Sequence, residues 1–253
     1  MSLFSKIVIG VIIYLVFLLV YLPANWLVSI APLPNNVAIS GAEGTLWQGQ
    51  ASLVTIDKRQ IEQVSWQLSP WGLLVGKADI DFKIGNRATP VSGKGSISWS
   101  FSGLRANNIR FDLPDSFLLA GARLPFKTQI DGDVSLMVEI LEQGKPWCEQ
   151  LSGKLFLNNT NVKNQYGVYP LGNISLELSC LDGQLKIATD ETQNVLGLTG
   201  SAILGESNLV KVSAKIKPTD AQPKDLREAL SFLGRQDSQG YYPINYQGVV
   251  PGL

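Results

Sequence analysis

Two pairs of carboxylates come nearest to a metal or acid–base site in this chain. Asp79 and Asp81 stand two residues apart in an alternating segment, and Asp131 and Asp133 flank Gly132. Side chains two apart point to the same face of a strand, so each pair could share one metal ion. Neither pair has a third acidic partner or a histidine beside it in the sequence, and solvated or turn carboxylates are the simpler interpretation. We therefore expect no metal site.

The composition closes most of the remaining routes to catalysis. The 253 residues include no histidine, which excludes Ser–His and Cys–His nucleophile pairs and most catalytic zinc sites. We find no phosphate-cradling Gly-rich loop, no zinc-type cysteine spacing and no nucleophile elbow. Lys and Arg together number 21, as do Asp and Glu, so no surplus positive charge favours nucleic acid. We expect no catalytic residue, no cofactor and no nucleic-acid partner.

The two cysteines, Cys148 and Cys180, are a disulfide candidate. An even count suits a compartment that oxidises thiols. Closing a loop of about 30 residues would stabilise the fold by roughly 3–4 kcal/mol on the chain-entropy model. Two buried free thiols are the alternative.

An uncharged stretch from Ile7 to Ile30 dominates the N-terminus. As helix it would measure about 36 Å, enough to cross a hydrocarbon core of roughly 30 Å. With Lys6 before it and Glu43 as the first charge after it, the positive-inside rule leaves residues 1–6 in the cytoplasm. We predict a single-pass anchor over residues 7–30, a linker over 31–36 and a domain over 37–253 on the far side. A cleaved signal peptide and a buried core helix are the alternatives.

The rest of the chain has the period-2 alternation of a mainly β protein. Runs of alternating polar and apolar residues cover residues 63–68, 78–84, 96–101, 134–140, 174–180 and 210–216. Turns are expected at Gly93, Asp131–Gly132, Asp182–Gly183 and Gly205, and one short amphipathic helix near Leu226–Leu233. These features predict a large curved antiparallel meander of ten or more strands. Its apolar face needs cover, so the sheet should form a barrel, a sandwich or a trough, or press against a partner, a membrane or lipid.

For three tryptophans of this β region the sequence allows a prediction of burial or exposure. Trp66 and Trp99 fall on the apolar faces of predicted strands, which favours packing in the core. Trp71 follows Ser69-Pro70 at a turn, where it is either exposed for contact or packed.

Three blocks resemble the type II secretion system protein N family, also called general secretion pathway protein N. They are Gly44-Thr45-Leu46-Trp47-Gln48-Gly49, the stretch from Trp66 to Leu68-Ser69-Pro70-Trp71, and Ala229–Asp237 with Gly240-Tyr241-Tyr242-Pro243. The family usually has proline after the arginine of the third block, where this chain has Gln236. The resemblance covers nearly the whole chain. It implies a non-catalytic accessory protein of the Gram-negative inner membrane, with its bulk in the periplasm.

The resemblance also sets the expected partners and leaves alternatives. The implied partners are other subunits of the type II secretion machine, in its inner-membrane platform and its periplasmic parts. An apolar face left uncovered favours a second function, a periplasmic lipid-binding or lipid-conduit β-trough. An envelope hydrolase is a third, and the sequence offers no cluster of residues for it.

Overall fold

The computed structural model describes residues 3–30, 33–34, 36–57, 59–119, 128–165, 167–189, 196–220, 222 and 224–249. Its helices are α1 (Leu3–Val20), α2 (Ala24–Ile30), α3 (Pro70–Leu74), α4 (Asp115–Leu118), α5 (Lys224–Ala229) and the 3-10 turns η3 (Glu206–Asn208) and η4 (Leu230–Leu233). Its strands are β1 (Val37–Gly44), β2 (Gln48–Ile56), β3 (Arg59–Leu68), β4 (Lys77–Ile84), β5 (Ser92–Ser100), β6 (Gly103–Pro114), β7 (Gln129–Gln143), β8 (Cys148–Asn164), β9 (Gly167–Leu181), β10 (Gln184–Thr189), β11 (Leu198–Leu204), β12 (Leu209–Ile216) and β13 (Tyr242–Val249).

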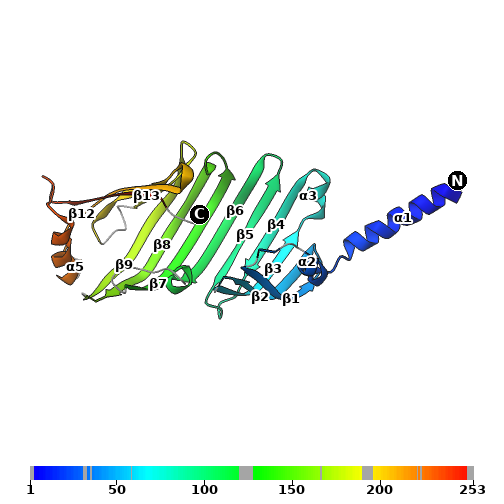
Figure 1. Cartoon of the computed structure of the whole chain (residues 1–253), viewed down its shortest axis with the longest axis horizontal. Coiled ribbons are helices and arrows are strands. Elements are labelled where there is room, and N and C mark those ends of the chain that lie inside the picture. Colours follow the sequence, from blue (N-terminus) through cyan, green and yellow to red (C-terminus); the bar gives the residue numbers. More distant parts are fainter. Residues whose placement is uncertain are drawn as a thin grey trace.

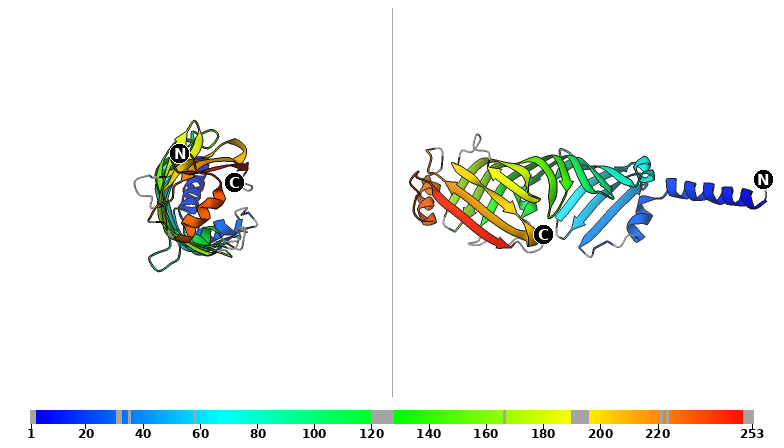
Figure 2. Two further views of the ribbon diagram at one scale, coloured as in Figure 1. Left: turned by 90° about the vertical axis from the view of Figure 1, so that its left-hand side faces the viewer. Right: turned by 90° about the horizontal axis from the view of Figure 1, so that it is seen from above.

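All the strands belong to one antiparallel meander. The 13 strands lie in sequence order from β1 to β13, each paired with its neighbours along the chain. The sheet is elongated in Figure 1, and its end view in Figure 2 is an open arc. Because β1 and β13 do not pair with each other, the sheet is not closed. The predicted curved meander is thus confirmed, in the form of a trough.

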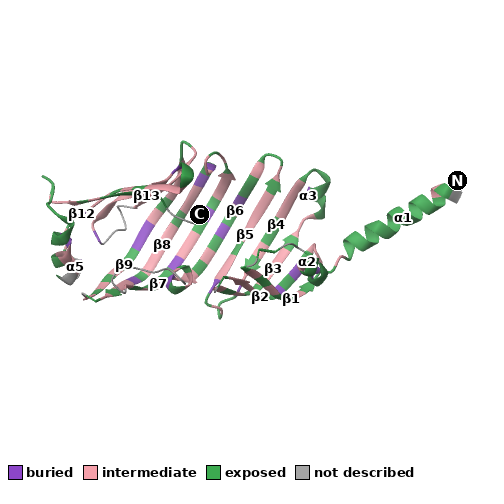
Figure 3. Cartoon of the chain, viewed as in Figure 1, coloured by how far each residue is buried: buried purple, intermediate pink, exposed green. Residues whose placement is uncertain are grey.

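The buried side chains gather on one face of the trough. Ala106, Ile109, Val138, Cys148 and Leu151 form a buried cluster, against which further apolar residues of β4 to β10 pack. Figure 3 shows these and other buried positions along the central strands.

Two of the four expected turns are confirmed. Leu181 pairs with Gln184, and Asp182 and Gly183 between them have φ of 50° and 80°, as in a two-residue hairpin turn. Gly205 closes the turn between β11 and β12 by donating its N–H to the carbonyl of Leu209.

The other two expected turns are wrong. Gly93 lies within β5 opposite Phe111, and a Cβ there would lie 2.4 Å from the ring atom Cδ1 of Phe111. Gly132 lies within β7 at a bulge between Asp131 and Asp133. In both strands glycine leaves room for a side chain that crosses the strand. A glycine that serves this purpose looks the same in the sequence as a glycine in a turn.

The expected single helix over residues 7–30 is divided into α1 and α2. The break at Tyr21, Leu22 and Pro23 has a local cause, because proline lacks an N–H and disfavours helical geometry in the residue before it. Within the residues that the structure describes, no helix reaches the combination of length and apolarity that membrane crossing requires. Figure 1 shows α1 projecting from one end of the sheet.

The expected C-terminal helix is present as α5 followed by η4. Leu230 is buried, whereas Phe232 is 90% exposed. Gly234 follows η4 with φ of 112°, a conformation that favours glycine at a helix end. Pro223, expected near the start of this helix, lies outside the described residues.

Candidate functional site

The candidate site is the junction between the end of α1 and the first strands of the sheet. The last carbonyls of a helix have no partner within the helix. The indole Nε1 of Trp47 donates to the carbonyl of Leu19 at 3.0 Å, and the N–H of Leu46 donates to the carbonyl of Leu22 at 3.0 Å. Pro23 forms an isolated bridge with Thr45. The β1–β2 turn therefore caps α1 and ties it to the sheet.

The turn that caps α1 depends on two glycines. Gly44 has φ of 86°, and a Cβ there would lie 2.6 Å from the carbonyl oxygen of Gln48. A Cβ on Gly49 would lie 2.4 Å from Cζ2 of Trp66 and 2.8 Å from the carbonyl oxygen of Glu43. Both positions therefore exclude a side chain, and they place Trp47 at the end of α1.

Trp66 supports the same turn from β3. Its Nε1 donates to the carbonyl of Leu46 at 3.1 Å, and it is partly buried, in accord with its expected place on the apolar face. Beside it lies a cavity of about 560 Å³ between α2 and the sheet. Its walls are almost wholly apolar and are formed by Ala24, Val28, Ile30, Leu33, Ile39, Leu46 and Trp66.

The short helix α3 is attached to this junction. The N–H of Leu68, just before α3, donates to the carbonyl of Trp47 at 2.7 Å. Gly72 of α3 is buried, and a Cβ there would lie 2.6 Å from the carbonyl oxygen of Lys77. Trp71 is 76% exposed, which is the exposed one of its two expected placements.

Trp99 does not pack in the core as expected. It pairs with Ala78 on the apolar face but is 68% exposed. Trp99 lies next to Ser100, the last residue of β5. Alternation predicts which face a side chain points to, and it does not predict how far neighbouring strands cover that face.

The predicted carboxylate pair on β4 is part of a strand-to-strand hydrogen-bond network. Ser98 donates to Asp79 and Ser96 donates to Asp81 across the β4–β5 pair, and Lys77 lies 3.1 Å from Asp79. The hydrogen bond from Ser98, aided by Lys77, lowers the pKa of Asp79. No group of three or more metal-binding side chains is found in the part of the chain that the structure describes.

Asp115 is a buried carboxylate that the sequence analysis missed. It is only 5% exposed, and its Oδ2 has no hydrogen-bond partner within the described residues. Burial raises the pKa of Asp115, and the neighbouring charges of Asp133 and Asp131 raise it further. The second predicted carboxylate pair therefore lies near a third carboxylate. No hydrophobic periodicity or motif marks Asp115, so the sequence carries no signal for it.

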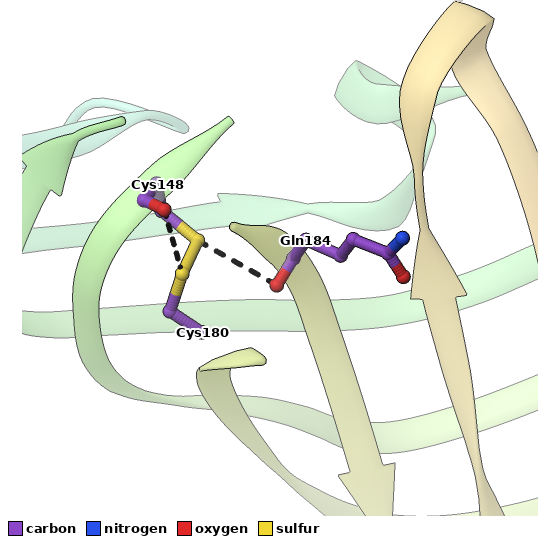
Figure 4. The surroundings of a disulfide bond; sticks show 3 residues. All are labelled: Cys148, Cys180 and Gln184. Carbon is purple, nitrogen blue, oxygen red and sulfur yellow. Dashed lines mark hydrogen bonds between the residues drawn. A yellow bond between two sulfur atoms is a disulfide. The ribbon is translucent and has the colours of Figure 1, made fainter. Parts of the chain in front are cut away.

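Cys148 and Cys180 lie at the turn end of the β8–β9–β10 region and are joined by a disulfide (Figure 4). Their Sγ atoms are 2.10 Å apart, and 32 positions separate the residues in sequence. The Sγ of Cys180 lies 2.9 Å from the carbonyl oxygen of Cys148, and the Sγ of Cys148 lies 3.6 Å from that of Gln184. Cys148 is 1% exposed, so the bridge is part of the buried cluster.

The C-terminal block forms a turn before β13. The carboxylate of Asp237 accepts hydrogen bonds from the N–H groups of Gln239 and Tyr241, at 2.8 and 2.9 Å. These backbone donors, that of Tyr241 above all, lower the pKa of Asp237. The ammonium group of Lys215 lies 4.3 Å from the ring centroid of Tyr241. Asp237 thus fixes the turn that leads into the last strand.

The fold and the junction together define a class of protein. An open, extended sheet is joined at one end to an apolar helix through a junction of hydrogen bonds. The hydrogen bonds, the disulfide and the close packing described above hold helices and strands together. This is the architecture of a structural component.

The comparisons with known proteins identify the family. The family described as type II secretion system (T2SS), protein N matches residues 35–245. The chain is 32% identical over 240 residues to the type II secretion system protein N of Aeromonas hydrophila, covering 94% of each chain. It is 30% identical over 230 residues to that of Vibrio cholerae, covering 90% of this chain and 91% of the relative. No solved structure matches.

The chain belongs to the type II secretion system protein N family. It is an accessory component of the type II secretion machinery, located in the cell envelope, and it is not an enzyme. The resemblance inferred from the three sequence blocks is confirmed.

Proposed function

We propose that the chain is a membrane-anchored, non-catalytic spacer of the secretion machine. In this proposal residues 7–30 hold the chain at the inner membrane, residues 1–6 lie in the cytoplasm and residues 31–36 are a linker. Residues 37–253 form a periplasmic trough that extends away from the membrane. The observation that carries the proposal is the exposed, uncharged surface of α1 from Ile7 to Val20.

Among the residues that the structure describes, none covers the side chains of α1 from Ile7 to Val20. From Ile7 to Val20 their exposed fractions lie between 40% for Val8 and 66% for Tyr14, and Figure 3 shows the helix exposed along its length. Apolar side chains exposed on every side of a helix are stable in lipid and costly in water. At 1.5 Å per residue the 14 residues of α1 from Ile7 to Val20 span about 21 Å, and a bilayer thins locally to match a short helix.

The residues after α1 suit the membrane–water interface. Trp26 of α2 is 55% exposed, and tryptophan concentrates at the headgroup level of bilayers. The backbone carbonyls at the end of α1 need partners in such an environment, and Trp47 and Leu46 supply them. An oxidising periplasm would also maintain the Cys148–Cys180 disulfide.

The far end of the trough supports contact with other secretion subunits. Phe232 and Leu233 of η4 are 90% and 44% exposed, and Tyr246 and Val249 of β13 are 59% and 63% exposed. Exposed apolar groups of this kind mark protein contacts. We place contacts with periplasmic parts of the machine at this end, and contacts with its inner-membrane platform near α1.

The anchor can be tested in the native host by complementing a deletion of the gene. The variant Ile12→Arg/Val16→Arg places two charges in the middle of α1, at a cost of about 2.5–3.5 kcal/mol per charge for insertion. We expect it to leave the membrane fraction and to lose the ability to restore secretion. The matched control, Ile12→Leu/Val16→Leu, should restore both. Full secretion by the arginine variant from a soluble fraction would contradict the proposal.

A second function, lipid binding, is favoured by the cavity of about 560 Å³ beside Trp66, which is within the size range of ligand sites. Its apolar walls would suit an acyl chain, and the open trough adjoins it. Native mass spectrometry of the full chain released from detergent is the test. A lipid that stays bound, and is lost on Val28→Trp substitution, would support this function; spectra without lipid would oppose it.

A further inference from the structure

We infer that the end of the trough carrying α3 rests on the bilayer, so that the chain contacts the membrane a second time. The contact surface, here called the α3 patch, consists of Trp71, Leu74, Val75 and Phe101. The inference rests on the proposed membrane insertion of α1. It concerns a part of the chain more than 40 residues after α1, as the numbering shows.

The α3 patch is an exposed apolar surface. Its four side chains, in the order named, are 76%, 77%, 78% and 99% exposed. Residues 69–76 include no charged residue. Phe101 belongs to the patch because its ring lies against the backbone of Gly76, where a Cβ would be 2.7 Å from the ring atom Cε2.

A short chain of hydrogen bonds holds this patch beside the end of α1. The indole of Trp47 donates to the carbonyl of Leu19 at 3.0 Å, and the carbonyl of Trp47 accepts the N–H of Leu68 at 2.7 Å. Only Ser69 separates Leu68 from the first residue of α3, a reach of about 7 Å at most. Figures 1 and 2 show α2 and α3 at the same end of the sheet as α1.

The position of the patch selects a lipid surface as its partner. If α1 is inserted through Val20, then Trp47, which bonds to Leu19, lies at the headgroup level, and α3 lies close to it. A tryptophan with aliphatic neighbours and no charge has the composition that partitions into this interface. The same side chains facing water would expose apolar area without any gain.

A second contact would also fix the direction of the trough. One helix leaves a domain free to tilt about its attachment point, whereas two contacts on one end of a sheet restrict that tilt. The inference therefore gives the α3 patch a role in aiming the trough away from the membrane.

Site-specific fluorescence quenching tests this inference on the full chain. Three variants, Ile12→Cys, Leu74→Cys and Phe232→Cys, are labelled with an environment-sensitive fluorophore while the native cysteines remain bridged. Each is reconstituted in vesicles of phosphatidylethanolamine and phosphatidylglycerol that carry acyl-chain quenchers. Phe232 is the matched control, because it is also highly exposed and lies in η4 at the opposite end of the sheet.

The three labels separate the inference from the proposed anchor. We expect the labels at positions 12 and 74 to lose most of their emission and the label at position 232 to keep it. Quenching at position 12 with none at position 74 would overturn the inference and preserve the anchor. Quenching at position 74 alone would contradict the anchor and overturn the inference of a second contact, because the α3 patch would then be the first. Quenching at neither position would overturn both.

Discussion

At the residue scale, the geometry of the junction is set by glycines and tryptophans that pack closely against one another. Gly49 has no room for a side chain because Trp66 crosses it, and Trp66 in turn donates to the carbonyl of Leu46. Leu46 and Trp47 then bind the end of α1. These residues therefore act by fixing one another's positions.

Gly49→Ala should destabilise the fold by roughly 1–3 kcal/mol, because the new methyl overlaps Trp66 and two backbone carbonyls. Chemical denaturation of the full chain in detergent, followed by tryptophan fluorescence, measures the effect. Gly205→Ala is the matched control, since a Cβ there meets Gln184 at an ordinary 3.5 Å. Equal stability of the two variants would contradict the role assigned to Gly49.

Asp115 should make stability depend on pH in an identifiable direction. Burial raises the pKa of Asp115 in the folded state. The protonated carboxyl group therefore contributes fully to the free energy of unfolding below the unfolded-state pKa of about 3.9, and this contribution is lost as the pH rises through the folded-state pKa. Asp115→Asn has no proton to lose. Its free energy of unfolding, relative to the native chain, should therefore rise from acid to neutral pH.

Urea denaturation of the native chain and the Asp115→Asn variant across this pH range measures that difference. The exposed Asp112→Asn is the control for the change of net charge. A difference between Asp115→Asn and the native chain that stays constant or falls with pH would show that the carboxylate is not destabilised by its surroundings.

At the element scale, the alternating runs predicted the strands because each strand has one buried and one solvated face. The positions of Trp66 on β3 and of the Asp182–Gly183 hairpin could be read in the same way. The exposure of Trp99 and the burial of Asp115 could not, since each depends on which distant segment lies alongside. The division of the N-terminal helix at Tyr21–Pro23 has instead a local cause in Pro23. Local sequence patterns predict the direction in which a side chain points, whereas tertiary contacts determine how far it is buried.

Trp47→Phe should loosen the attachment of α1, because it removes the hydrogen bond to Leu19 and keeps an aromatic ring. We expect a loss of about 1 kcal/mol of local stability, seen as faster hydrogen exchange of the N–H of Leu46. Trp147→Phe is the matched control, since its indole donates to Gly205 at 2.7 Å, far from the junction in sequence. An unchanged exchange rate of the Leu46 N–H in Trp47→Phe would show that the indole hydrogen bond does not hold α1 to the sheet.

The disulfide should stabilise the region of β8 to β10. For residues 32 positions apart, the chain-entropy model gives about 3–4 kcal/mol, so Cys148→Ser/Cys180→Ser should lose about that much. Denaturation with and without reductant is the measurement, and the double variant should not respond to reductant. A native chain whose stability is also unaffected by reductant would indicate that the thiols are not bridged.

At the scale of the whole molecule, the open trough, the apolar helix at one end and the exposed side chains at the other suit a component that bridges a distance. The sheet has a buried apolar cluster on its central strands, and its two edge strands, β1 and β13, are unpaired with each other. Membership of the type II secretion system protein N family agrees with a structural role. Orientation in the membrane is therefore the property on which the proposed function depends.

The most direct test of that orientation is labelling with a maleimide that cannot cross the inner membrane. Phe232→Cys and Phe4→Cys are compared in spheroplasts, both being exposed positions, at 90% and 76%. Our account predicts that Phe232→Cys is labelled in intact spheroplasts and that Phe4→Cys is labelled only after the inner membrane is permeabilised. Protection of Phe232→Cys until permeabilisation would place the trough on the cytoplasmic side and contradict the account.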